Sequence, residues 1–351
     1  MRYHSVMANS IRRSKAVTLA DVAKRAGLAV MTVSRYLNGY PNITEKTARK
    51  VKDAIDELGY RPNQAARILM GQPSNVIGLI IPNLANPFFA SIAHSVQQTA
   101  LQCGYLVWIA ATNDESKSDT ELIQRMRDHQ VDGILLASSP GMVLHKHDLD
   151  QVPLVAIDRP VKGITADYVT IEDRMAAHAA VEHLLSHGYQ RIACFGLSAM
   201  IYSIEERIIG YQEAMKAKGL AVLPYAQCED KKSAKSVICK LLSGRSPVQA
   251  IFPANATATI LALEALNDLN ISVPEGLALF SYGDIPLGHV FRPPISAVRQ
   301  PTALLGEIAT RHLLELIAAK RPSTGVRTTI PASLVIRQSC GCAAHSDIPT
   351  E

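Results

Sequence analysis

The first sixty residues place apolar side chains at the spacing of short helices. Leu19, Val22, Ala23 and Ala26 recur three or four positions apart, which is the periodicity of one helical face. Thr18 precedes this stretch and predicts an N-cap, because its hydroxyl can accept a hydrogen bond from a free amide of the first turn. The pattern therefore predicts a helix that begins directly after this threonine.

Two further helices are predicted beyond this one. Gly27 permits a sharp turn, after which Val33 and Leu37 would pack inward from a second helix. A third helix is expected between a cap at Thr44 and a stop at Gly59. A helix, a glycine turn, a helix and a buttressing third helix form an all-α helix-turn-helix head, whose second helix suits the major groove of DNA.

From residue 75 onward, short aliphatic runs alternate with helical stretches. This alternation predicts an α/β body of parallel sheets flanked by helices. Residues 300–319 are expected to form a helix that returns to the first of two similar lobes. The runs of the first series are VIGLIIP, YLVWIAAT, GILLAS and PLVAID, and those of the second are YVTI, RIACFG, VQAIFPA and LALFSY.

The positive charge is concentrated at one end of the chain. The whole sequence has 36 basic and 31 acidic residues, a formal charge of +5, but residues 1–72 alone hold 13 basic and 5 acidic residues. A basic head on a mildly acidic body predicts a polyanion as the partner of the head and a different ligand for the body. A solvated, lysine-rich helical cap is the alternative that charge alone leaves open.

Composition narrows the class of protein further. With 48% hydrophobic residues among 351, wholesale disorder is excluded. No apolar run approaches the roughly 20 residues that span a bilayer, and the first residues lack a signal-peptide stretch. We therefore expect a cytoplasmic protein that does not contact a membrane. Six scattered cysteines are expected to be buried, reduced thiols rather than a disulfide framework.

No catalytic motif of the GxSxG, P-loop or HExxH type is present in the sequence. His183 and His187 are four residues apart, but no cysteine or acidic partner is evident at a useful spacing. Cys340 and Cys342 likewise have no second pair to complete a zinc site. We expect surface or interlobe histidines, no metal, no cofactor and no catalytic residue. The rival classes are a ligand-binding transport protein and an α/β enzyme with an appended head.

The segment TLADVAKRAGLAVMTVSRYLNG, followed by ITEKTARKVKDAIDELGYRPNQAARIL, resembles the head of the LacI/GalR family of bacterial transcription regulators. The resemblance is without gaps from Thr18 to Leu69 and continues more loosely to about residue 338. It implies a homodimer that binds double-stranded operator DNA, usually as a repressor, under the control of a sugar-like effector between two periplasmic-binding-protein-like lobes. The implied division is a basic tail at 1–17, a DNA-binding head at 18–62, a hinge at 63–73, an effector-binding and dimerisation body at 74–339 and a tail at 340–351.

By this resemblance, Val30 and Met31 occupy variable base-reading positions and Arg35 a shared base-contacting position. Arginine suits guanine because its planar fork donates to O6 and N7 together. Ala29 departs from the usual serine, so we expect a helix cap to be missing there. The hinge is too short to be a stable isolated helix, and the resemblance implies that it orders on DNA with a leucine wedge. The remaining DNA-binding positions are Thr18, Thr32, Ser34, Asn38, Thr47, Asn63, Ala66 and Leu69.

Polar and aromatic residues that follow the predicted strands form the candidate effector site. Carboxylate, guanidinium and carboxamide groups can hold the hydroxyls of a polyol with directed hydrogen bonds. Plain packing is an alternative for the two phenylalanines, and a capping or salt-bridge role is an alternative for the first aspartate. The candidate residues are Asn86, Phe88, Phe89, Asp158, Arg207, Asn255, Asp284 and Gln300.

Two departures from the family pattern concern this site. Ala256 stands where the family usually has aspartate, and Gly283 stands where the first of two aspartates commonly binds sugar hydroxyls. Either the ligand lacks a donor there, or it is acidic or bulkier, or Asp284 substitutes through a shifted turn. The sequence leaves these three explanations open.

Overall fold

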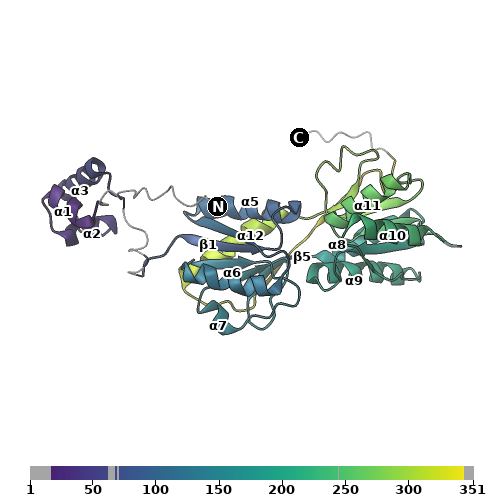
Figure 1. The fold of residues 1–351 in the computed structure, drawn as a ribbon, viewed down its shortest axis with the longest axis horizontal. Helices are drawn as coiled ribbons and strands as arrows, with labels where there is room; N and C mark the ends of the chain where they lie inside the picture. The colour runs from purple at the N-terminus through teal and green to yellow at the C-terminus, as the bar shows by residue number, and fades with distance from the viewer. Residues whose placement is uncertain (1–16, 62–67, 69–70, 244, 344–351) are drawn as a thin grey trace, which may run out of the picture. The chain divides into compact units, whose positions relative to one another are not determined.

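The computed structural model describes residues 17–61, 68, 71–243 and 245–343. The chain forms two compact units, residues 1–73 and 74–351. The predictions for Asn63, Ala66 and Leu69 of the hinge lie outside the described residues. Figure 1 shows the head as three short helices, labelled α1 to α3, and the body as two sheets with helices around them.

The head consists of α1 (Leu19–Ala26), α2 (Val30–Leu37) and α3 (Glu45–Leu58). All three follow the helices predicted from the apolar spacing. Gly27 ends α1 with φ +66°, a left-handed conformation that glycine adopts without a steric penalty. The core of the head lies where the three helices meet and is made of Val22, Ala23, Val33, Val51 and Ala54.

The first lobe of the body is a six-stranded parallel sheet with the order β11-β5-β4-β3-β1-β2. Helices α5 (Pro87–Gln102) and α12 (Thr302–Ala319) cover one face, and α6 (Ser116–Asp128) covers the other. A short helix, α7 (Lys146–Leu149), follows β3. The strands are β1 (Val76–Ile81), β2 (Leu106–Ala111), β3 (Gly133–Leu136), β4 (Leu154–Ile157), β5 (Asp167–Ile171) and β11 (Arg327–Ile330).

The second lobe is a sheet with the order β12-β10-β9-β8-β6-β7, in which β12 is antiparallel to β10. Alternate side chains of the central strands face the helices on opposite sides. The strands are β6 (Ile192–Gly196), β7 (Ala226–Gln227), β8 (Ala250–Pro253), β9 (Ala278–Tyr282), β10 (Ser296–Arg299) and β12 (Ser333–Val335). The helices are α8 (Asp173–Ser186), α9 (Tyr202–Ala217), α10 (Lys231–Leu242) and α11 (Ala256–Asp268).

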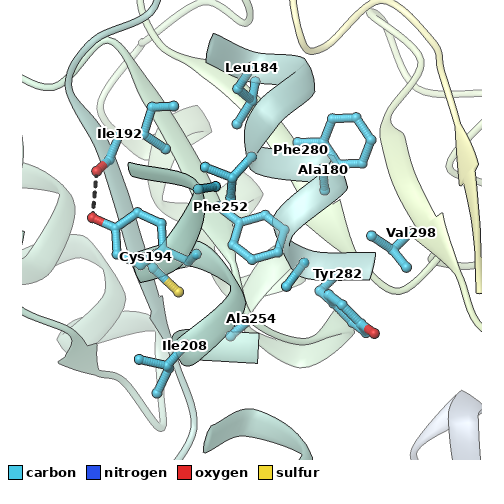
Figure 2. Packing of buried hydrophobic residues seen from close by; sticks show 14 of the residues in the cluster. Ala180, Leu184, Ile192, Cys194, Ile208, Phe252, Ala254, Phe280, Tyr282 and Val298 are labelled. Atoms are coloured by element: carbon cyan, nitrogen blue, oxygen red, sulfur yellow. Dashed lines mark hydrogen bonds between the residues drawn. The ribbon is translucent and has the colours of Figure 1, made fainter. Parts of the chain in front are cut away.

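The core of the second lobe combines aromatic rings with small side chains. Figure 2 shows Phe252, Phe280 and Tyr282 from neighbouring strands packed beside Ala180 of α8. The buried hydroxyl of Tyr211 donates to the carbonyl oxygen of Ile192 at 2.9 Å, which satisfies a polar group inside this core. This packing holds α8 and α9 against the sheet.

The chain crosses between the two lobes three times, after β5, after β10 and after β11. The expectation that YVTI opens the second lobe is wrong, because β5 pairs with β4 and β11 in the first sheet. The expected return of residues 300–319 is confirmed, since α12 packs against the first sheet. Among the described helices, none combines the length and apolar character needed to cross a membrane.

Candidate functional site

The outer face of α2 carries the residues predicted to read bases. Val30 is 47% exposed and Met31 is 65% exposed, and Arg35 is also exposed. Val33, on the opposite face, is fully buried and anchors the helix to the head. Apolar side chains this exposed at a helix start are available for contact with a thymine methyl, and the arginine is available for a guanine.

The first turns of α1 and α2 differ in how they are capped. The hydroxyl of Thr18 accepts from the backbone amide of Asp21 at 3.3 Å, and the backbone amide of Thr18 donates to the Asp21 carboxylate at 2.9 Å, which completes a capping box. At the start of α2, Ala29 makes no side-chain cap, as expected from the sequence. The free amides of this turn form an electropositive end that suits a phosphate.

Three of the predicted phosphate contacts already have partners within the N-terminal unit. The hydroxyl of Thr47 lies 2.9 Å from that of Thr44, in the cap of α3. Asn38 accepts from the side-chain amide of Gln72 at 2.9 Å and donates to the hydroxyl of Ser34 at 3.5 Å. Thr32 is half-buried on α2.

A cavity of about 450 Å³ lies between the two lobes of the body. It opens at the carboxyl ends of β1 and β4 and at the starts of α9 and α11, where ligands of open α/β sheets bind. The structure brings seven of the eight predicted effector residues into its lining, namely Asn86, Phe88, Phe89, Asp158, Arg207, Asn255 and Gln300.

Asp158 follows β4 in a left-handed conformation with φ +64° and is only 2% exposed. Its Oδ2 accepts from the hydroxyl of Ser203 at 3.3 Å. The adjacent Arg159 forms an ion pair with Asp114 at 2.7 Å and donates to the carbonyl oxygen of Ser138 at 2.9 Å. Arg159 Nε forms an ion pair with Asp158 Oδ2 at 3.4 Å but makes no hydrogen bond among the described residues, and Asp158 Oδ1 has no hydrogen-bond partner there. A buried polar atom without a partner is costly, so this pair is prepared for a ligand.

Sequence reasoning missed Arg159. Its signal was the charged pair Asp158-Arg159 directly after the aliphatic run PLVAI, at a strand end where ligands bind. The guanidinium of Arg159 also lies 5.9 Å from the ring centre of Phe89. Phe89 is buried in the first-lobe core and contacts the neighbouring Phe88 edge to face at 5.0 Å, so packing and cavity lining coexist in this residue.

Arg207 of α9 is held rigidly at the floor of the cavity. Its Nε donates to Asp173 at 2.8 Å, an Nη donates to the carbonyl oxygen of Ala254 at 3.0 Å, and its guanidinium lies 4.0 Å from the ring centre of Tyr282. Burial opposes the charged form, but the carboxylate of Asp173 outweighs it and raises the pKa of Arg207. The guanidinium is therefore a fixed positive group.

Asn86 and Asn255 each cap a helix beside the cavity, one in each lobe. Asn86 Oδ1 accepts from the amide of Phe88 at 3.0 Å and caps α5, and Asn255 Oδ1 accepts from the amide of Ala258 at 2.7 Å and caps α11. Each cap uses the carbonyl oxygen of the side chain, so each Nδ2 group is a donor beside the cavity.

Asp284 is a correction to the predicted site, because it does not line the cavity. Arg337 donates to both of its carboxylate oxygens, at 2.7 and 3.0 Å, and Arg299 donates to Oδ2 at 2.7 Å. Burial opposes ionisation, but these two arginines outweigh it and hold the pKa of Asp284 below its usual value. In this arrangement the carboxylate of Asp284 faces Arg337 and Arg299 rather than the cavity.

Both the head and the body of the chain resemble known proteins. Residues 18–63 match the model of the bacterial regulatory proteins of the lacI family, and residues 181–340 match a periplasmic binding protein-like domain. A ribose operon repressor from Halalkalibacterium halodurans is 31% identical over 94% of this chain and 99% of its own length. The chain belongs to the LacI family.

Solved structures agree with this assignment. The Lac repressor dimer bound to its operator and an anti-inducer matches with a TM-score of 0.80 at 24% identity, over 93% of this chain and 99% of that one. A complex of the transcriptional regulator CelR with cellobiose is 29% identical, with a TM-score of 0.66, over 92% of this chain and 99% of that one. This LacI-family protein is a DNA-binding transcription regulator and not an enzyme.

Within this LacI-family fold, the structure corrects the interpretation of the histidines and cysteines. His183 Nε2 lies 3.3 Å from Cys340 Sγ, and His187 Nε2 lies 3.2 Å from Cys342 Sγ. The interpretation that these histidines lack cysteine partners is therefore wrong, because the fold joins positions more than 150 residues apart. All six cysteines are free, as expected, but only Cys194, Cys228 and Cys340 are buried, whereas Cys103 and Cys239 are exposed and Cys342 is half-buried.

Proposed function

We propose that this regulator is a cytoplasmic repressor that binds a pseudo-palindromic operator as a homodimer, with an affinity that changes when a sugar-like molecule fills the cavity. The observation that carries the proposal is the buried pair Asp158 and Arg159, each of which has a polar atom without a hydrogen-bond partner in the described chain. A sugar is supported by two of the similar proteins, since CelR was solved as a complex with cellobiose and the relative from Halalkalibacterium halodurans is a ribose operon repressor.

The lining favours a polyol over an apolar ligand. Asp158 accepts from a hydroxyl, Arg159 and Arg207 donate to hydroxyl oxygens, and Asn86 and Asn255 donate through their free amide groups. Phe88 adds an aromatic surface on which a sugar ring can lie.

The ligand differs in one region from the usual sugars of the family. Ala256 lines the cavity where the family pattern has an aspartate, and a Cβ built at Gly283 would lie 3.1 Å from the Cβ of Ala256. Both missing carboxylates thus belong to one small region. We expect a ligand that is bulkier here or presents no hydroxyl donor to this wall.

The DNA contacts that we propose lie on the head and in the hinge. We assign base reading to Val30, Met31 and Arg35, because these side chains are exposed on α2. We assign phosphate or minor-groove contacts, by family resemblance, to Thr18, Thr32, Ser34, Asn38, Thr47, Asn63, Ala66 and Leu69. We keep the division into a head at 18–62, a hinge at 63–73 and a body at 74–339.

A second copy of the chain is the partner that we propose for the exposed edge of the first sheet. β2 is an edge strand in this sheet, and Leu106, Trp108 and Ile109 are exposed along it. Apolar edge strands are normally covered or charged, and two heads are needed for a two-fold symmetric operator. Replacing Leu106 by glutamate is expected to give monomers in sedimentation, and an unchanged dimer would contradict this interface.

Ligand binding couples to DNA through the closure of the lobes in this proposal. Asp158 of the first lobe and Arg207 of the second meet one ligand, so occupation favours one interlobe geometry and biases the hinge. The coupling is reciprocal, so operator DNA must change the ligand affinity by the same factor. Because the operator is chromosomal DNA, we place the protein in the cytoplasm.

A thermal-shift screen of sugars and nucleobases, followed by operator titration with each hit, tests this function. We expect a sugar or sugar derivative to raise the melting temperature and to change the operator affinity at fixed salt. A protein that binds no bacterial promoter fragment at low ionic strength would refute DNA binding. A ligand that stabilises the body without changing operator affinity would refute the coupling.

A further inference from the structure

Four side chains with metal-ligand chemistry gather where the end of the described chain meets α8. His183 lies in the last turn of this helix and His187 is its C-cap residue. Cys340 and Cys342 lie beside them, in the segment that follows the last strand. Each residue offers one atom that can bind a metal, a histidine nitrogen or a cysteine sulfur, and these four atoms all lie within 4.8 Å of one another.

The separations of these atoms fit a tetrahedral ion. His183 Nε2 lies 3.3 Å from Cys340 Sγ and 3.5 Å from Cys342 Sγ, and His187 Nε2 lies 3.2 Å from Cys342 Sγ. In a tetrahedral zinc site, bonds of about 2.3 Å to sulfur and about 2.0 Å to nitrogen place neighbouring sulfur and nitrogen ligands roughly 3.5 Å apart. An ion therefore fits with only small movements of the side chains.

The backbone between the two cysteines is shaped for this arrangement. Gly341 has φ +99°, a conformation that side chains rarely adopt, and a Cβ at this position would lie 2.6 Å from the hydroxyl oxygen of Tyr189. Glycine therefore allows the turn that brings Cys340 and Cys342 to the same pair of histidines.

The surroundings support a metal-bound thiolate. The hydroxyl of Ser296 donates to Cys340 Sγ at 3.2 Å, the kind of outer hydrogen bond that orients and stabilises a ligand. Cys340 is buried, whereas His187 is exposed. One side of the cluster is thus open to solvent, from which an ion can enter.

We propose that His183, His187, Cys340 and Cys342 form a Cys₂His₂ site for a divalent metal ion of the zinc class. Thiolate and imidazole ligands favour zinc over hard cations such as Mg²⁺, and four protein ligands leave no open position for catalysis. On binding, each cysteine releases its thiol proton to the solvent and donates a sulfur lone pair to the ion. The role of the site is structural.

The position of the site gives the ion a defined mechanical effect. It joins the C-terminal segment to the end of α8, and the first residue of the same helix, Asp173, holds Arg207 at the cavity floor. An ion that binds only the folded protein stabilises it. Metal removal is therefore expected to lower the melting temperature of the full-length protein.

Cobalt titration of the full-length protein tests the proposal directly. The protein is stripped with a chelator under reducing conditions, and Co²⁺ is added as the probe. We expect one ion per chain, with thiolate-to-cobalt charge-transfer bands and the visible bands of a tetrahedral site, both of which disappear when Zn²⁺ is added. Absence of tetrahedral bands in the wild-type protein overturns the proposal.

Matched variants locate the ion. Cys342→Ser and His187→Gln are chosen because neither residue is fully buried. Each substitution should abolish the cobalt absorption bands and lower the affinity for Co²⁺ at least ten-fold. Cys239→Ser and His147→Gln, at exposed positions outside the cluster, should leave both unchanged. A wild-type spectrum from Cys342→Ser overturns the assignment, as does an intact mass that reveals a Cys340–Cys342 disulfide in metal-free protein isolated under reducing conditions.

Discussion

Ser203 of α9 donates a hydrogen bond to Asp158 Oδ2 at 3.3 Å and so joins the second lobe to the end of β4 in the first. The other oxygen of Asp158 has no partner among the described residues. The residue also has a positive φ of +64°, a conformation that persists at functional sites when the surroundings enforce it. Asp158 is therefore placed to contact a ligand and the opposite lobe together.

Asp158→Asn should weaken binding of a sugar identified in the thermal-shift screen. The amide retains the size of the carboxylate, but it removes the charge from hydrogen bonds worth about 1.5–3 kcal/mol each, so we expect a loss of roughly ten-fold or more. Isothermal titration calorimetry measures this change. Asp150→Asn, at a largely exposed residue, is the control, and equal affinities for the two variants would contradict the assignment.

Arg35→Ala should abolish operator-specific binding and leave the head folded. The side chain is exposed on α2, and a bidentate contact to guanine is worth about 1–3 kcal/mol of discrimination. Fluorescence anisotropy at fixed salt, with operator and scrambled duplexes, measures the difference. Arg49→Ala is the control, because it removes an exposed cation that pairs with Glu45. It should weaken binding to the operator and to the scrambled duplex alike. Unchanged operator affinity of Arg35→Ala would refute base reading.

Ala29→Ser should stabilise the head. The residue is the N-cap of α2 and has extended dihedrals, but it offers no side-chain acceptor. A serine at such a position raises the free energy of unfolding by about 1 kcal/mol. Thr18→Ala should lower it by a similar amount, because it removes the capping box of α1. Thermal unfolding followed by circular dichroism measures both changes. A destabilising Ala29→Ser would show that the cap geometry is wrong.

Gly283→Ala should destabilise the second lobe. The glycine has φ +110°, and the added Cβ would lie 3.1 Å from the Cβ of Ala256; backbone strain alone costs about 1–3 kcal/mol. Gly104→Ala is the control, because it has a φ of +81° but no atom within 4 Å of the added Cβ. The melting temperature should fall further for Gly283→Ala than for Gly104→Ala. Equal losses would exclude a contribution from the contact between the added Cβ and Ala256.

Asp167→Asn should remove an acid-sensitive part of the stability. The carboxylate accepts from His312 Nε2 at 2.8 Å and from the amides of residues 324–326 at 2.7–2.9 Å. Burial opposes ionisation, but these bonds outweigh it and lower the pKa of Asp167. Its stabilising effect is thus complete above the ordinary aspartate pKa of about 4 and disappears as the pH falls towards the lower folded value.

Unfolding of the wild type and of Asp167→Asn at several pH values measures this effect. We expect the variant to be about 1–3 kcal/mol less stable near neutral pH, with a difference that shrinks as the pH falls below about 4. A constant difference across this range would contradict the assigned role. Asp128→Asn, at an exposed residue, is the control.

The local elements could be predicted from the sequence because short-range rules determine them. Thr18, Gly27 and Gly59 define the starts and ends of helices in the head, and both glycines have the expected left-handed conformation. Asn86 and Asn255 also follow a local rule, because each comes after a strand and caps the next helix, although the sequence pattern indicated them only as effector contacts.

The remaining features depend on distant contacts, which a single sequence does not reveal. β11 and β12 are short and partly exposed, and they form only because β5 and β10 offer free edges. Asp284 looked like a ligand contact until Arg337 was placed beside it, 53 residues further on. His183 and Cys340 are separated by 157 residues, so sequence spacing could not predict their contact.

The three crossings between the lobes have a consequence for synthesis. The first sheet needs β11 at its edge and α12 on its face, and both lie beyond the strands β6 to β10 of the second sheet. A ribosome must therefore synthesise the chain as far as β11 and β12 before the two lobes have their full sets of strands. Truncated products end with an unfinished sheet in each half, which makes them ready substrates for chaperones and proteases.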